Sequence, residues 1–193
     1  MRLAAMRERR GPLWQNGDFL RLWSAQTISQ FGSQISGLAL PLVAILLLDA
    51  SAFEVAALGV VEYLPFILFS LPAGAWVDRL RRRPILIAAD WGRALALGTV
   101  PAAYFLGGLT IWQLYVVGFV VGTLTVFFDV SYQSYLPSLV EREELPDANG
   151  KLEVSRSAAQ TAGPGVAGVL VSILSAPYAI VADAVSFVAS ALF

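Results

Sequence analysis

The sequence contains no cysteine and no histidine. Without cysteine, the chain has no disulfide framework, no thiolate metal site and no thiol nucleophile. Without histidine, most zinc sites and the familiar serine and cysteine triads are excluded as well. These two absences argue against the common metalloenzymes and hydrolases, and we expect neither a metal site nor a cofactor.

Charged residues are also scarce. They make up 14% of the 193 residues, whereas hydrophobic residues make up 57%. Because a soluble domain carries about 25% charged residues, the composition predicts a membrane protein. The apolar stretches leave no room for a soluble domain, so we expect neither a soluble enzyme nor a nucleic-acid partner.

Long apolar runs are abundant, and six of them are long enough to cross a bilayer. They predict an all-α, polytopic membrane protein with a cytoplasmic tail at 1–17 and a six-helix transmembrane bundle at 18–193. The six helices are predicted at about 20–48, 53–76, 84–106, 109–136, 152–174 and 177–193. Because the last run reaches Phe193 without a polar exit, the chain is expected to be truncated at its C-terminus.

The basic residues gather on one side of such a bundle. Twelve of the 13 Lys and Arg residues fall in the tail, at Arg21, at 79–83 or at 142–156, all on one side if six helices alternate. The thirteenth, Arg93, lies inside the third helix, and the three opposite turns have none. The positive-inside rule therefore predicts a multi-pass protein of the cell (plasma) membrane with both termini in the cytoplasm.

Polar residues form a stripe along the first helix, where Gln26, Gln30 and Gln34 recur at helical spacing. Polar stripes avoid lipid, so this face is expected to line a watery cavity, and hydrogen bonding between helices accounts for it equally well. Glu62 and Asp129 join them as candidates for a proton or substrate cavity, because burial permits reversible protonation of a carboxyl group. For Asp129, bonding to the nearby loop is the alternative.

The other intramembrane charges are interpreted as structural. Asp90 and Arg93 lie three residues apart on one helix face and are expected to form an ion pair. Asp183, in the sixth helix, is expected to cap a helix or to form a local hydrogen bond.

The densest charge cluster lies between the second and third helices. Arginine costs about 2.5–3.5 kcal/mol at mid-bilayer, so this loop must lie in water or among headgroups, and a turn that obeys the positive-inside rule is the simplest interpretation. The cluster also resembles the signature loop of the major facilitator superfamily, G-x-x-x-D-R/K-x-G-x-R/K-R/K. Matching residues are Gly74, Asp78, Arg79, Arg82 and Arg83, whereas Arg81 stands where the family usually has glycine. The resemblance implies a conformational latch.

Other motifs agree with this resemblance. The segments 19–23 and 62–65 resemble a bacterial exporter branch that includes siderophore and macrolide efflux proteins. Gly163-Pro164-x-x-Ala167-Gly168 resembles the helix 5 kink motif of antiporter members, with Ala167 in place of a glycine, although an ordinary proline kink is the alternative. The helix 4 arginine of many proton-linked members is missing, because Gly118 occupies its position.

The resemblance implies the N-terminal six-helix half of a twelve-helix transporter fold. It further implies a secondary active transporter, not an enzyme, that exports small amphipathic compounds in exchange for protons by alternating access. The expected partners are the lipid bilayer, a small-molecule substrate, protons and a second six-helix half. A truncated or regulatory membrane fragment without transport activity is the alternative.

Overall fold

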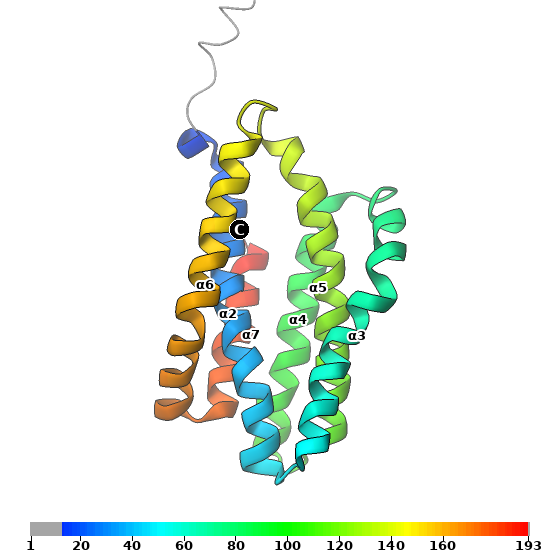
Figure 1. Cartoon of the computed structure of the whole chain (residues 1–193), viewed down its shortest axis with the longest axis vertical. Coiled ribbons are helices and arrows are strands. Elements are labelled where there is room, and N and C mark those ends of the chain that lie inside the picture. The colour runs from blue at the N-terminus through cyan, green and yellow to red at the C-terminus, as the bar shows by residue number, and fades with distance from the viewer. Residues whose placement is uncertain (1–12, 193) are drawn as a thin grey trace, which may run out of the picture.

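The computed structural model describes residues 13–192, and these residues form six α-helices and one short 3-10 helix. The elements are η1 (Leu13–Gln15), α2 (Gly17–Leu48), α3 (Ala52–Val77), α4 (Arg82–Phe105), α5 (Ile111–Leu139), α6 (Leu145–Leu174) and α7 (Ala176–Leu192). The helices run up and down in an elongated bundle (Figure 1). The protein is therefore all-α, as the sequence predicts.

Two groups of helices make up the bundle (Figure 1). In one group α2 packs against α6 and α7, and in the other α5 packs against α3 and α4. The contact between α4 and α7 joins the groups. Five helices, α2 to α6, are long and apolar enough to cross a membrane, and α7 is a shorter apolar helix of 17 residues. This architecture agrees with half of a major facilitator fold.

The turns at one end of the bundle are short and locally specified. Ser51 caps α3 through a capping box, in which its Oγ accepts a hydrogen bond from the backbone N–H of Glu54 while the Glu54 carboxylate accepts one from the Ser51 N–H. Gly107 adopts a φ of 69° just after α4, a conformation that favours glycine. A single residue, Ser175, links α6 to α7.

The opposite end carries the turns at 78–81 and 140–144, and most of the basic side chains of the described chain lie there. We call it the basic end. It also holds η1, whereas the sequence assigns positions 13–17 to a polar tail. Leu13 is buried, and Gly17 already belongs to α2. The remainder of the predicted tail, 1–12, lies outside the described residues.

The helix bounds agree with the predicted runs except at α6. This helix begins at Leu145, whereas the sequence predicts a start near 152. The added turns are rich in polar residues, so a criterion based on apolar length misses them. These first turns of α6 carry exposed polar side chains, among them Asp147 and Asn149.

The core and the outer surface are both apolar. Leu58, Leu97, Leu114 and Ile180 are fully buried between helices. Large apolar side chains also cover much of the outside, and Leu71 is 90% exposed. A bundle that is apolar on both sides fits a hydrocarbon solvent, in which the helices associate mainly through close packing.

Candidate functional site

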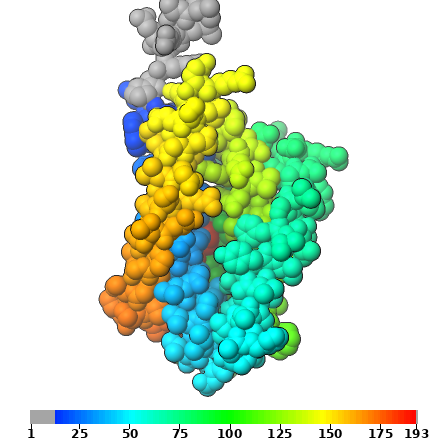
Figure 2. All heavy atoms as spheres, in the orientation of Figure 1, coloured from blue at the N-terminus to red at the C-terminus, as the bar shows by residue number. Residues whose placement is uncertain are grey.

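A polar cavity of about 590 Å³ opens between α2, α5 and α6 near the basic end. The space-filling view shows the surface hollowed between α6 and α5 (Figure 2). The helix α2 contributes Gln26, Ser29, Gln30 and Ser33 to its wall. These positions follow the 3.6-residue helical repeat, which places them on one face.

Three of the predicted cavity residues line this space, namely Gln26, Gln30 and Asp129. Gln34 lies elsewhere on α2, directly against Gly163 of α6. Glu62 is half-buried between α3 and α5, with its Cγ against Gly118. The structure thus brings part of the predicted set together and places Gln34 and Glu62 at helix contacts outside the wall of this cavity.

The helix α6 supplies a polar wall that the sequence analysis missed. Asn149, Glu153, Arg156 and Gln160 all line the cavity. Their spacing of three or four residues is the signal that was available, since it marks one face of a helix. Asn149 lies outside the helix predicted at about 152–174, so the sequence did not show that all four residues share one face.

The helix α5 forms the facing wall. Thr125, Asp129 and Gln133 recur every four residues along it, and Phe128 and Tyr132 line the cavity beside them. Phe128 and Tyr132 are stacked, with ring centroids 6.2 Å apart. The cavity therefore combines amides, carboxylates and aromatic faces, a mixture suited to small molecules with both polar and apolar parts.

Asp129 presents a charge to this cavity. It is half-buried and forms no ion pair within 4 Å among the residues of the described chain. The positive charges of Arg93 and Arg156 act on it electrostatically from α4 and α6. The Asp129 carboxylate thus lines the cavity under the influence of two positive charges, with no ion-pair partner among the described residues.

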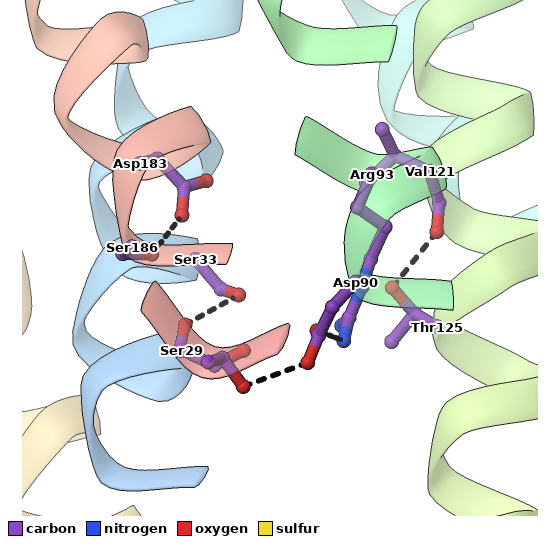
Figure 3. A network of polar contacts seen from close by, with 9 residues as sticks. Ser29, Ser33, Asp90, Arg93, Val121, Thr125, Asp183 and Ser186 are labelled. Carbon is purple, nitrogen blue, oxygen red and sulfur yellow. Dashed lines mark hydrogen bonds and ion pairs between the residues drawn. The ribbon is translucent and has the colours of Figure 1, made fainter. Parts of the chain in front are cut away.

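Arg93 lies at the inner wall of the cavity and is almost fully buried. Its Nη2 donates a hydrogen bond to Asp90 (Figure 3). The second carboxylate oxygen of Asp90 accepts a hydrogen bond of 2.7 Å from Ser190 on α7. The guanidinium lies between two phenyl rings, 4.3 Å from the centroid of Phe128 and 4.2 Å from that of Phe187. These contacts fix the guanidinium between α4, α5 and α7.

Asp183 forms a second buried polar group, between α7 and α2. Its Oδ1 accepts a hydrogen bond of 3.0 Å from Ser186 (Figure 3). The facing residue on α2 is Gly32, where an added Cβ would lie 2.3 Å from Asp183 Oδ1. Asp183 therefore lies at a helix contact made possible by a glycine, away from the cavity wall.

The loop predicted as a latch joins α3 to α4 at the basic end. Asp78 is the C-cap of α3, and its backbone N–H donates to the Gly74 carbonyl. The side chains of Asp78, Arg79 and Arg83 are exposed, and that of Arg82 is half-buried. None of these four residues forms an ion pair with another residue of the 13–192 segment. Their charges are available to another surface.

The predicted kink motif lies inside α6, which remains helical through Pro164. Gly163 accommodates the Gln34 side chain, because a Cβ there would lie 2.5 Å from Gln34 Cγ. Gly168 faces open space. Within the described residues, no group of three or more acidic side chains could hold a metal ion.

Comparisons with known proteins agree with this arrangement. A family model described as "Transmembrane secretion effector" matches residues 10–192. Macrolide efflux protein A of Streptococcus pyogenes is 27% identical over 155 residues, which cover 80% of this chain and 38% of the relative. Multidrug efflux pump Tap of Mycolicibacterium fortuitum is 29% identical over 172 residues, which cover 86% of this chain and 40% of the pump.

A third relative is the uncharacterised MFS-type transporter YkuC of Bacillus subtilis, 26% identical over 183 residues, or 93% of this chain and 41% of the relative. No solved structure matches the chain significantly. The chain thus spans about two fifths of the length of these curated relatives. The family match covers nearly every residue, and the chain belongs to the transmembrane secretion effector family of major facilitator superfamily (MFS) membrane transporters.

Proposed function

We propose that this chain is the N-terminal half of a secondary active transporter that exports small amphipathic compounds by alternating access. The observation that supports this most directly is the polar cavity between α2, α5 and α6, set in an otherwise apolar bundle. Relatives named as macrolide and multidrug efflux proteins match 80% and 86% of this chain. A central polar cavity reached alternately from each side is the working principle of such transporters.

A second six-helix half completes the cavity in this proposal. Glu153, Arg156 and Gln160 are exposed on α6 although α6 is a candidate membrane span. Charged side chains that face lipid are costly, so this face needs a polar partner or water. A second bundle docked over α2, α5 and α6 covers these side chains and provides the moving partner for alternating access.

Asp129 is the residue we assign to proton or substrate handling. It lines the cavity, and it has no ion-pair partner within the described part of the chain. Protons would drive export by competing with the substrate for the cavity. Glu62, half-buried against Gly118 and Gly122, is the second carboxylate we propose for proton transfer.

The basic end faces the cytoplasm in this proposal. The turn 78–81 and the segment 140–151 carry basic residues, whereas the turns at 49–51, 106–110 and 175 contain none. Positively charged loops are retained on the cytoplasmic side. Both termini of the six-helix half then lie in the cytoplasm, and the cavity seen here opens towards that side.

The test is drug accumulation in efflux-deficient bacteria that express the transporter with its second half. A labelled macrolide should accumulate less in these cells than in cells with an empty vector, and Asp129→Asn should restore accumulation at equal expression. The matched control is Asp18→Asn, because Asp18 is exposed at the start of α2 and, within residues 13–192, forms an ion pair with Arg21 alone. Accumulation equal to the empty vector for a panel of macrolides and amphipathic dyes would reject the proposal.

A further inference from the structure

A short segment, Leu13–Asn16, contacts three helices at the basic end. We infer that this segment is a clasp, which holds α5 and α6 at a fixed separation and so sets the width of the cavity mouth. The inference deepens the proposed function, because the clasp residues position the walls of the proposed transport cavity. The structural part of the inference does not depend on transport.

Contacts that connect α5 to α6 are needed because the two helices pack mainly against different neighbours. The helix α6 packs against α2 and α7, whereas α5 packs against α3 and α4. The cavity lies between them, and the loop 140–144 connects them at the basic end. Their separation at the mouth therefore depends on contacts made beside that loop.

Leu13 supplies the apolar part of the clasp. It is 4% exposed and belongs to a buried cluster with residues of α5 and α6. At the end of α5 the cluster includes Leu136 and the C-cap residue Val140. On α6 it includes Ala148 and Leu152. Leu136 and Leu152 also line the cavity. The cluster around Leu13 thus lies directly behind the two walls of the mouth.

Asn16 supplies a polar tie to α5. Its Oδ1 accepts a hydrogen bond of 3.1 Å from the backbone N–H of Phe19 and so caps α2. Its Nδ2 donates a bond of 2.8 Å to the carbonyl oxygen of Leu139, the last residue of α5. One side chain therefore joins the first turn of α2 to the end of α5.

Two tryptophans supply the tie to α6. Trp23 Nε1 donates a hydrogen bond of 3.0 Å to Ser155 Oγ. Trp14 packs edge-on against Trp23, with ring centroids 5.5 Å apart. Lys151 Nζ lies 5.1 Å from the Trp14 ring centroid and bonds to Asp147 at 2.7 Å. The exposed Trp14 ring thus links α2 to the beginning of α6.

The clasp has a consequence for alternating access. If α5 and α6 are fastened to α2 at the mouth, the half moves as one rigid body against its partner half. The cavity then opens and closes by movement between halves, and the α5–α6 separation stays constant.

The chain is well suited to a direct distance measurement, because it contains no native cysteine. Spin labels at Ser138→Cys on α5 and Val154→Cys on α6 report the mouth, and both positions are exposed. Distances are measured by double electron–electron resonance in lipid nanodiscs. Asn16→Asp keeps the cap acceptor and replaces the donor to Leu139 with a carboxylate oxygen. The triple variant combines this change with Leu13→Ala and Trp14→Ala, which remove the apolar and aromatic contacts.

We expect Asn16→Asp to broaden the distance distribution. The triple variant should shift it to distances longer by about 1–5 Å, the range from a small helix shift to a one-turn displacement. Trp112→Ala is the matched control, because Trp112 is an equally large aromatic residue that is 73% exposed at the opposite end of α5. It should leave the distribution unchanged.

A second label pair at the opposite end separates a local clasp from a general loss of fold. Leu106→Cys and Ile173→Cys lie there at exposed positions. Their distance should stay constant in the triple variant. An unchanged α5–α6 distance, or equal changes at both ends, would overturn the clasp. Neither result bears on whether the protein transports, so this failure is distinguishable from that of the proposed function.

Discussion

Gly122 of α5 lies directly against the backbone of Glu62 on α3. A Cβ added to Gly122 would lie 2.4 Å from the Glu62 carbonyl oxygen and 3.1 Å from Pro65 Cγ. Gly118, one turn earlier, meets the Glu62 side chain, with 2.9 Å between an added Cβ and Glu62 Cγ. The α3–α5 contact is therefore a close approach that requires small residues, as is common between membrane helices.

Gly122→Ala should destabilise the protein because a carbonyl oxygen fixed in a helix backbone cannot turn away. Overpacking of this kind costs about 1–3 kcal/mol. We expect the free energy of unfolding to fall by this amount, and steric trapping in bicelles measures it. Gly98→Ala is the control, since Gly98 is also helical and has nothing within 4 Å of an added Cβ. Equal stabilities for the two variants would show that the α3–α5 approach is looser than the structure describes.

The Asp90–Arg93 pair should behave as one unit in a double-mutant cycle. Asp90→Asn leaves the buried guanidinium without its bonded carboxylate, which costs about 3 kcal/mol. Arg93→Gln should also destabilise, and the double variant should cost clearly less than the sum of the two. Thermal unfolding in detergent measures the three variants. Additive effects would mean that the two charges are not coupled.

The exposed Asp78 should matter for transport and little for folding. Asp78→Asn keeps the shape of the side chain and removes a charge that has no partner within the described residues. We expect normal expression, normal thermal stability and a several-fold lower export rate in the transporter with its second half. Asp49→Asn is the control at the opposite end, where asparagine tolerates the left-handed backbone of Asp49 (φ 49°). Equal export rates for the two variants would mean that the loop determines only the orientation of the helices in the membrane.

The orientation can be tested with single cysteines. Gly108→Cys and Ser175→Cys lie in exposed turns at one end, and Ser138→Cys lies exposed at the basic end. A membrane-impermeant maleimide added to intact cells should label the first two and spare the third. The third should react only after the membrane is made permeable. Labelling of Ser138→Cys from outside would reverse the proposed topology.

The helices were predictable because a run without charges is a strong signal at the length of a bilayer. The prolines did not break them: Pro41, Pro65, Pro101 and Pro164 all lie inside helices. Neighbouring helices and local rearrangements satisfy the backbone groups that proline frees. The weakest prediction was the start of α6, where charged residues read as a loop although they continue a helix.

The cavity was predictable only in part, because residues on one stripe of a long helix need not share an environment. Gln26 and Gln30 line the cavity, whereas Gln34, the next member of the stripe, contacts Gly163. Which side chain of α2 lines the cavity depends on where α2 and α6 approach each other closely. That close approach is made possible by Gly163 on α6. Periodicity in one helix holds no information about its partner.

The one-residue link at Ser175 has a consequence for the way the chain enters the bilayer. Since α6 ends at Leu174 and α7 begins at Ala176, the link is too short for one helix to cross while the other waits in water at a distance. We therefore expect the two helices to insert as a hairpin, in which the transfer free energy of the apolar α7 offsets part of the cost of the more polar α6. On this expectation Glu153, Arg156 and Gln160 enter the bilayer together with the helix that offsets their cost, and the pairing of α6 with α7 matters for insertion as well as for the folded state.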